Sequence, residues 1–192
     1  MFDQLCDYIQ CRHPVTAAEL ADICLHFTPC QAPKGTLLVY EGAICQQYPF
    51  VNQGALRMYF VDRNGHEQTR YFALEGSFGS ALASFIYEEP AVEFVEALEP
   101  VSLLLIRRPA FYHLVDTVPA FAFVYREILE QAYRASVKRI GSFMAMDARQ
   151  RFEWVLANQP HLLQRVSGRI LASYLDMTPE TLSRLKKEVW NP

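Results

Sequence analysis

The spacing of apolar residues along the chain changes twice, from helical to strand-like and back to helical. Near the N-terminus, Leu20, Ile23 and Phe27 share one helical face behind a capping box formed by Thr16 and Glu19. The middle of the chain has short apolar runs broken by glycine, and the last third again has helical spacing. The pattern predicts an α+β chain with helices on both sides of a β-rich region.

The β-rich region extends from Lys34 to about Arg108. Many short strands at regular spacing are typical of an antiparallel sandwich or jelly roll. An Arg63-Asn64-Gly65 hairpin signal lies between two of the runs, and a short helix is expected from Pro109 to Val115. The expected strands are Thr36–Tyr40, Tyr48–Asn52, Ala55–Val61, Gln68–Leu74, Val92–Leu98 and Ser102–Ile106.

A long helix is expected from Pro119 to about residue 142. A further helix is expected after it, capped by Asp147 with Gln150 and ended by Pro160. The apolar residues of the long helix recur every three or four positions and form a narrow stripe with charged shoulders, which is typical of a dimeric coiled coil. The same stripe could pack on the chain's own β-rich region, and both can hold at different positions along the helix. The candidate dimer-interface residues are Phe121, Val124, Ile128, Ala132 and Ala135.

The segment from Ser167 to Lys187 predicts two short helices joined by a tight turn. Asp176 stands at the turn, where a left-handed residue is needed, and Thr178 and Pro179 suit the start of a second helix. This layout is typical of a helix-turn-helix, whose second helix enters the major groove of DNA. A plain helical hairpin is the alternative. The residues expected to form the shared core are Leu171, Ala172, Leu175, Met177, Leu182 and Leu185.

Charge is divided unevenly along the chain, whose formal net charge is −3. Residues 1–137 carry nine Lys or Arg against 16 Asp or Glu, whereas residues 138–192 carry nine against five. A basic C-terminal segment on an acidic body is typical of a nucleic-acid-binding module. With 51% hydrophobic and 20% charged residues, no signal peptide and no membrane-length apolar run, we expect a cytoplasmic globular protein without a membrane partner.

The cysteines do not match a metal-binding pattern. Their number is odd and no C-x2-C pair occurs, so we expect neither a structural disulfide framework nor a metal or iron–sulfur site, and their redox role is left open. No nucleophile–base constellation, catalytic metal motif or phosphate-binding glycine loop is present, so we expect no enzyme and no cofactor. The five cysteines are Cys6, Cys11, Cys24, Cys30 and Cys45.

Several segments follow one another in an order shared with a known family. They are Lys34–Gly35, Glu41–Gly42, Pro49–Gly54, Leu56–Asp62, Glu75–Gly79, Asp147 and Thr178–Arg184. In this order they resemble the CRP/FNR family of bacterial transcription regulators. The resemblance implies a β-barrel sensor domain with N-terminal helices over residues 1–118, a dimerisation helix over 119–142 and a helix-turn-helix DNA-binding domain over 143–192.

The resemblance also implies partners. They are double-stranded DNA and a second copy of the chain, with RNA polymerase as a further candidate and a small-molecule effector of unknown identity. Because the chain stops at Pro192, we expect the wing that many members carry after the recognition helix to be truncated or absent.

The expected ligand pocket departs from the family pattern. Cyclic-nucleotide-binding members carry a Glu that binds the ribose and, further along, an Arg that pairs with the phosphate. Here Ser80 replaces the acid and no Arg or Lys occurs between Tyr71 and Leu105, so we expect no cAMP or cGMP binding. Either an apolar or cationic ligand binds there or side chains fill the site. The candidate pocket residues are Phe72, Phe78, Gly79, Ser80, Phe85 and Tyr87.

The second helix of the turn motif carries the expected base-reading residues. By similarity, Glu180 would accept a hydrogen bond from a cytosine amino group and Arg184 would donate two to a guanine edge. Thr181 and Lys187 share or adjoin this face, and Pro179 stands where several family members carry a base-reading Arg. The expected phosphate contacts are Ser167, Arg169, Thr178 and Lys186.

These expectations combine into one function. We expect a homodimeric transcription regulator that reads DNA and responds either to a ligand other than cAMP or to no small ligand. The alternative is a β-barrel small-molecule-binding or protein-interaction module that does not read DNA.

Overall fold

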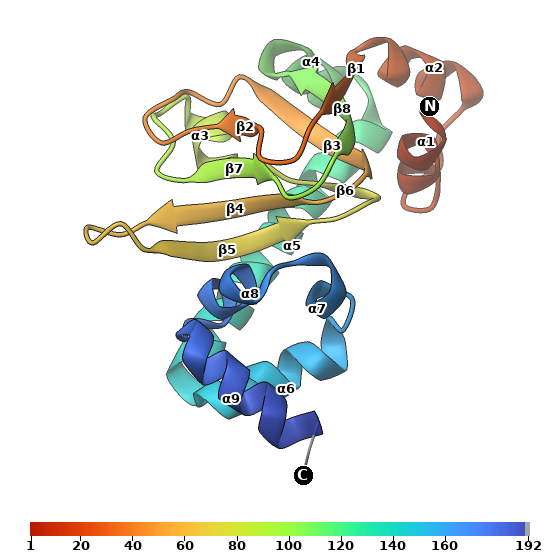
Figure 1. Cartoon of the computed structure of the whole chain (residues 1–192). Helices are drawn as coiled ribbons and strands as arrows, with labels where there is room; N and C mark the ends of the chain where they lie inside the picture. The colour runs from red at the N-terminus through yellow and green to blue at the C-terminus, as the bar shows by residue number, and fades with distance from the viewer. Residues whose placement is uncertain (191–192) are drawn as a thin grey trace. The chain divides into compact units, whose positions relative to one another are not determined.

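The computed structural model describes residues 1–190, which form two compact units (Figure 1). Unit 1 comprises residues 1–58 and 72–131. Unit 2 comprises residues 59–71, which form most of a β-hairpin, and the chain from residue 132 onward. The chain has the expected α+β class, with antiparallel sheets followed by a long helix and further C-terminal helices.

The strands form two four-stranded sheets, in the orders β1-β8-β3-β6 and β2-β7-β4-β5. In the first sheet the neighbouring strands pair antiparallel, as β2 and β7 do in the second. The strands are β1 (Phe27–Ala32), β2 (Leu37–Val39), β3 (Gln47–Gln53), β4 (Leu56–Val61), β5 (Glu67–Ala73), β6 (Ser77–Phe78), β7 (Phe94–Ala97) and β8 (Val101–Arg107).

Helices precede, interrupt and follow the sheets. Within residues 1–190 they are α1 (Asp3–Gln10), α2 (Ala17–Leu25), α3 (Leu82–Tyr87), α4 (Arg108–Thr117), α5 (Pro119–Ala145), α6 (Ala148–Asn158), α7 (Leu162–Arg165), α8 (Gly168–Leu175) and α9 (Pro179–Trp190). No helix in this range is long and apolar enough to cross a membrane. The expected lack of a wing concerns residues 191–192, which lie outside the described part of the chain.

The predicted capping boxes at the starts of α2 and α6 are both present. Thr16 exchanges hydrogen bonds with Glu19, and Asp147 does so with Gln150. Each box satisfies backbone N–H groups that a helix start leaves without partners. These local signals fix where the two helices begin.

Phe27 corrects the sequence prediction at the end of the first predicted helix. Its spacing placed it on the helical face, but α2 ends at Leu25 and Phe27 begins β1, where it pairs with Ile106. Pro29 lies in this strand. A proline is tolerated there because β1 is an edge strand of its sheet.

The core of unit 1 is rich in aromatic rings. The ring of Phe78 lies 5.0 Å from that of Phe50, and α1 adds Tyr8, whose ring is 5.6 Å from both. Phe111 of α4 and Phe121 of α5 pack 5.1 Å apart. Helices α1, α4 and α5 therefore complete a core that begins in the sheets.

The first half of α5 packs on its own unit. Phe121, Val124 and Ile128 are buried within the single chain, which leaves no free surface on these three side chains for a second copy. Ala132 and Ala135 are half-buried. A second apolar row is exposed on α5, and its members, spaced three or four residues apart, are Leu129, Tyr133, Val137, Ile140 and Met144.

Unit 2 has a small core of its own between α6, α8 and α9. The predicted shared core is confirmed, with Met177 only partly buried at its edge. The α6 residues Phe152 and Val155 add to it. The buried members are Phe152, Val155, Leu171, Ala172, Leu175, Leu182 and Leu185.

Candidate nucleic-acid interface and ligand cavity

The turn between α8 and α9 has the backbone that the sequence predicted. Asp176 ends α8 in the left-handed region, with a φ of 52°, a conformation that Asp tolerates better than most residues. The Oγ1 of Thr178 accepts a hydrogen bond from the backbone N–H of Thr181, 3.2 Å away, and so caps α9. The two helices are therefore set by local residues as well as by their core.

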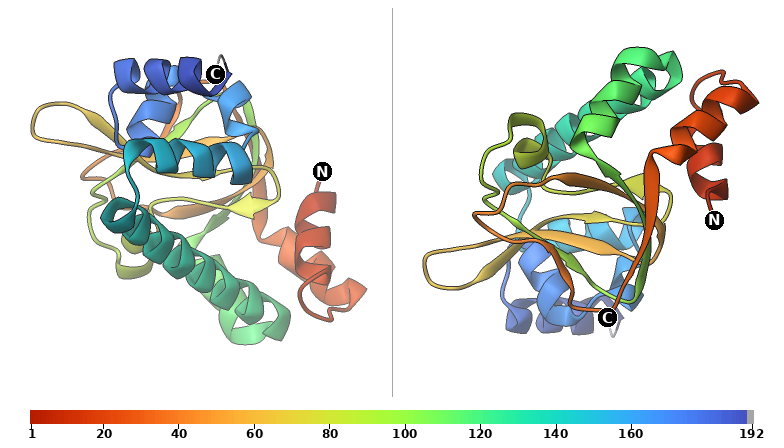
Figure 2. Two further views of the ribbon diagram at one scale, coloured as in Figure 1. Left: turned by 90° about the horizontal axis from the view of Figure 1, so that it is seen from below. Right: turned by 90° about the horizontal axis from the view of Figure 1, so that it is seen from above.

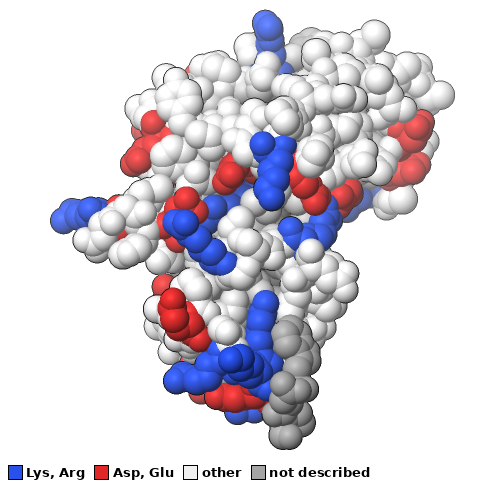
Figure 3. All heavy atoms as spheres, in the orientation of Figure 1, with Lys and Arg blue, Asp and Glu red and all other residues white. Residues whose placement is uncertain are grey.

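The outward face of α9 is polar and lies opposite Leu182 and Leu185, which are buried. Pro179, Glu180, Ser183, Arg184 and Lys187 line one shallow hollow on this face. Figure 3 shows Lys and Arg side chains beside one another over α9, with acidic side chains among them. The structure thus brings three predicted base-reading residues, Glu180, Arg184 and Lys187, to one face.

Ser183 belongs to the same face and was missed by the sequence prediction. It lies three residues after Glu180 and four before Lys187, so helical periodicity could have identified it. The predicted residues Thr181 and Lys186 are instead half-buried at the two flanks of α9.

Ion pairs tie the α9 face to α6. Glu188 lies 3.9 Å from the Nε of Arg184 and 3.8 Å from the Nη1 of Arg149. The side chain of Arg184 is 71% exposed, so these long contacts leave it able to reorient. Hydrogen bonds from its own backbone N–H and from Thr178 lower the pKa of Glu180, which keeps it a charged acceptor.

The predicted phosphate contacts at the start of α8 are exposed. Ser167 caps α8 by accepting a hydrogen bond from the N–H of Ile170, 3.3 Å away. Its hydroxyl group can still donate to a second acceptor. Arg169 is the second residue of α8 and is also exposed.

Some basic residues of unit 2 serve the fold. Arg151 of α6 donates to three backbone carbonyls, those of Met146, Leu175 and Asp176, at 2.8, 2.8 and 3.2 Å. Arg139 of α5 donates to the carbonyl of Tyr174, and burial lowers its pKa. The basic charge of the C-terminal segment therefore overstates the charge available to a nucleic acid.

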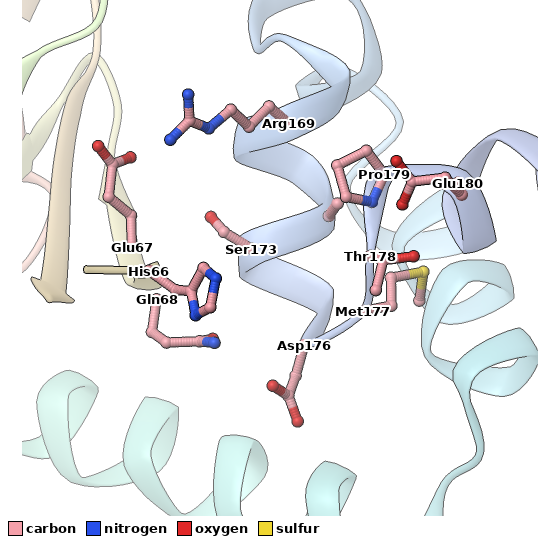
Figure 4. A pocket seen from close by; sticks show the side chains of 11 residues that line it. His66, Glu67, Gln68, Arg169, Ser173, Asp176, Met177, Thr178, Pro179 and Glu180 are labelled. Atoms are coloured by element: carbon pink, nitrogen blue, oxygen red, sulfur yellow. The ribbon is translucent and has the colours of Figure 1, made fainter. Parts of the chain in front are cut away.

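A larger hollow of about 570 Å³ lies in unit 2 between the β4–β5 hairpin tip and α8 (Figure 4). Figure 4 shows Arg169 extending from α8 toward Glu67 of the hairpin, with His66 and Ser173 pointing into the same space. The sequence prediction missed this site, because nothing local in the hairpin indicates that it would lie beside α8.

A pair of hydroxyl groups joins the hairpin to α8. The Oγ atoms of Thr69 and Ser173 are 2.5 Å apart. Either hydroxyl can be the donor between them, and the Ser173 hydroxyl also lies 2.8 Å from the carbonyl of Ile170. Thr69 is fully buried whereas Ser173 is only half-buried, so the bond is partly shielded from water.

The predicted ligand-pocket residues separate in the structure. Phe85 packs 4.9 Å from Tyr48 and 5.2 Å from Phe111, and Phe72 and Phe78 are also buried in the core. Tyr87 is 70% exposed. A Cβ on Gly79 would lie 2.6 Å from Met58 Cε, so the backbone there is closely packed.

Ser80, one of the predicted pocket residues, lines a cavity of unit 1. This cavity, of about 270 Å³, lies between β2, the loop that follows it, the start of β3 and the last part of β8. The Ser80 Oγ is 3.2 Å from Cys45 Sγ, and burial raises the pKa of that thiol. The lining residues carry no charge; they are Leu38, Val39, Tyr40, Ala43, Ile44, Cys45, Gln46, Gln47, Pro49, Ser80 and Leu105.

Two arginines of unit 1 are engaged by the protein itself. Arg57, only 2% exposed, lies 3.6 Å from Glu96. Arg108 donates to the carbonyls of Phe85 and Ile86 at 2.8 and 3.0 Å and pairs with Glu88 at 2.9 Å. Neither guanidinium is placed to receive a phosphate without first losing these partners.

No group of three His, Cys, Asp or Glu side chains arranged to hold a metal ion occurs among residues 1–190.

Residues 29–118 match the family model of the cyclic nucleotide-binding domain. This segment includes the cavity of unit 1 and both engaged arginines. No curated protein sequence matches the chain.

Solved structures match over most of the chain. CLP, a c-di-GMP-responsive global regulator from Xanthomonas campestris, has a TM-score of 0.73 at 17% identity and covers 91% of this chain and 92% of its own. FixK2 from Bradyrhizobium japonicum has a TM-score of 0.75 at 19% identity, covering 85% and 84%. A crp/fnr-family transcriptional regulator from Eubacterium rectale has a TM-score of 0.72 at 17% identity, covering 92% and 85%.

Proposed function

The chain has the fold of CRP/FNR regulators, and we propose that it is a transcription regulator that binds double-stranded DNA through α8 and α9. The observation that carries the proposal is the outward face of α9, where Glu180, Ser183, Arg184 and Lys187 line one exposed hollow. A capped helix with an apolar inner face and such an outer face has the form of a recognition helix.

The residues of this face have different roles in the proposal. Arg184 donates two hydrogen bonds to a guanine edge, and Glu180 accepts one from a cytosine amino group. Lys187 and Ser183 adjoin them and contact bases or the backbone. Thr181 and the phosphate contacts Ser167, Arg169, Thr178 and Lys186 position the module without reading sequence.

Two copies pair along α5 in this proposal. The seam is the exposed row that includes Tyr133, Val137 and Ile140, since the first half of the predicted stripe is already covered within the chain. Its spacing of three and four residues is that of a coiled-coil seam. Pairing along α5 would present two recognition helices to successive major grooves, about 34 Å apart.

The effector in this proposal is not a cyclic nucleotide. The 270 Å³ cavity has no charged lining residue, so an anionic phosphate buried there would lack a partner. The same argument applies to c-di-GMP, to which CLP responds. The cavity suits a small uncharged molecule. The alternative is a regulator that is controlled by no small ligand.

The test compares Arg184→Ala with Arg169→Ala on DNA fragments enriched from a host genome. Arg184→Ala should weaken binding to the enriched site by about 1–3 kcal/mol and relax preference at one base pair per half-site. Arg169→Ala should weaken binding to every sequence alike and lower the salt slope by roughly one per phosphate contact. Fluorescence anisotropy over a salt series measures both quantities.

Arg126→Ala is the matched control. It removes the same charge from an exposed α5 residue outside unit 2, so it should leave affinity and salt slope unchanged. If Arg184→Ala loses affinity equally on all sequences, α9 does not read bases through Arg184. If neither Arg184→Ala nor Arg169→Ala changes the affinity for DNA, α8 and α9 are not the DNA-binding surface. The alternative function, a module that does not read DNA, is then better supported.

The seam has a separate test by light scattering at micromolar concentration. Wild type should be a dimer, and Ile140→Glu should shift it toward monomer by about 100-fold in dissociation constant, because a buried carboxylate without a partner is costly. Leu25→Glu, at an 83% exposed site on α2, should remain dimeric. A monomeric wild type would contradict the pairing.

A further inference from the structure

Two cysteine sulfurs face each other across the N-terminal helices. The Sγ of Cys6 on α1 lies 3.7 Å from the Sγ of Cys24 on α2, and Figure 2 shows these two helices, in red, side by side in both views. A disulfide needs a separation of about 2.0 Å, so the sulfurs must approach by about 1.7 Å. Both side chains are half-buried, which leaves the pair open to a small solute.

The other three cysteines have different surroundings. Cys45 is buried, and its Sγ lies 3.2 Å from both Ser80 Oγ and the carbonyl of Gln47. Cys30 contacts the carbonyl of Gln31 at 3.9 Å, and Cys11 is exposed. Proximity therefore distinguishes Cys6 and Cys24 from the remaining thiols.

We propose that Cys6 and Cys24 form a reversible intrachain disulfide when a two-electron oxidant such as hydrogen peroxide is present. First, the Cys6 sulfur attacks a peroxide oxygen, the O–O bond breaks, and a sulfenic acid and one water form. Then the Cys24 sulfur attacks the Cys6 sulfur and displaces hydroxide, which takes the Cys24 proton and leaves as a second water. Two thiols are oxidised and one peroxide is reduced.

The surroundings of Cys24 support this order of steps. Burial and, secondarily, its hydrogen bond with Cys6 raise the pKa of Cys24 to about 12. Cys24 is therefore protonated at neutral pH and is a poor first nucleophile. In the second step the proton of Cys24 passes to the oxygen that leaves the Cys6 sulfur, so proton transfer accompanies the attack.

The bond would tie down a helix that contacts two parts of unit 1. Tyr8 of α1 packs on Phe50 and Phe78, and the Nε of Arg12, two residues after α1, lies 2.8 Å from Glu127 of α5. Linking α1 to α2 closes a loop between residues 18 positions apart, which restricts the unfolded chain. Oxidised protein should therefore melt about 5–10 °C above reduced protein.

The experiment treats the purified full chain with hydrogen peroxide, blocks the remaining thiols with an alkylating reagent and maps the products by mass spectrometry. Cleavage before Asp7 separates Cys6 from Cys11, and fragment spectra separate Cys24 from Cys30. The expected product is a Cys6–Cys24 cross-link within one chain, two hydrogens lighter than the reduced protein and reversed by dithiothreitol.

Single variants give the matched comparison. Cys6→Ser and Cys24→Ser should each abolish the cross-link and the rise in melting temperature, whereas Cys11→Ser and Cys30→Ser should keep both. A dominant cross-link through Cys11 or between chains, or oxidation to sulfinic acid without a disulfide, overturns the proposal. If a variant fails to fold, the map of the wild-type product still decides, and neither readout depends on DNA binding.

Discussion

The outward face of α9 and the cavity of unit 1 differ in whether charged side chains line them. On α9, Glu180, Arg184 and Lys187 project from the helix around an exposed hollow. In unit 1, the cavity is lined without charge, while Arg57 and Arg108 are bound by neighbouring carboxylates and carbonyls. The same chain therefore exposes charged side chains on α9, while the arginines that an anionic ligand in unit 1 would need are bound by other groups of the protein.

The largest expected effect on stability tests how tightly the core of each unit is packed. Phe85 was a predicted ligand-pocket residue but is fully buried, as Phe152 is in unit 2. Phe85→Ala and Phe152→Ala should each lower the free energy of unfolding by about 3–5 kcal/mol, because each leaves a cavity. Urea denaturation followed by circular dichroism measures both losses.

Tyr87→Ala is the control for this comparison, since Tyr87 is largely exposed and should cost under about 0.5 kcal/mol. A loss below about 1 kcal/mol for Phe85→Ala would mean that its site is loosely filled and open to a ligand. The contrast between the two regions would then be smaller than the structure indicates.

A smaller loss in stability is expected where an arginine of unit 2 donates hydrogen bonds to backbone carbonyls. Arg151→Met keeps the length of the side chain but removes its bonds to three carbonyls. The loss in stability should be about 2–3 kcal/mol, since hydrogen bonds from charged groups contribute most when their acceptors are partly buried. Arg149→Met, whose partners are exposed carboxylates, should change stability by under about 1 kcal/mol.

Equal losses at Arg149 and Arg151 would show that charge alone, and not the carbonyl contacts, stabilises unit 2. The basic residues of this unit could then not be sorted into structural and nucleic-acid-binding groups. Thermal and urea unfolding of the two variants distinguish these outcomes.

The last prediction is that cAMP does not bind. Titration calorimetry with cAMP should give no saturable heat at micromolar concentration, because the lining of the cavity offers no cation to the phosphate. Saturable binding would show that Arg57 or Arg108 gives up its present partners for the nucleotide. The contrast between the two regions would then describe only the ligand-free state.

The sequence predicts elements best where their signals are local. The capping boxes at Thr16 and Asp147 and the turn at Asp176 are confirmed, because each depends on residues three or four positions apart. The residue pattern did not predict α1, because Phe2 at its N-cap makes no capping bond, although the family resemblance implied N-terminal helices. It missed α3 because Glu88 ends that helix in a left-handed conformation usually marked by glycine. The resemblance to CRP/FNR regulators is confirmed at the level of the fold.

Site residues are harder to predict because their roles depend on distant contacts. The apolar spacing on α5 is real, but which face meets the chain's own core is decided by Phe27 and Phe111, far away in sequence. The carbonyl contacts of Arg151 and the position of Glu67 beside α8 likewise follow from tertiary packing. The DNA contacts and the domain boundaries stay predictions.

The three carbonyl contacts of Arg151 also bear on how unit 2 opens. One side chain joins the residue after α5, its own helix and the turn before α9, so none of these can open without releasing the others. Amide hydrogen exchange should therefore report one cooperative unit, in which Asp176 and Met177, bonded to Ala172, exchange as slowly as the centre of α6. The turn would then be as long-lived as the helices that it connects.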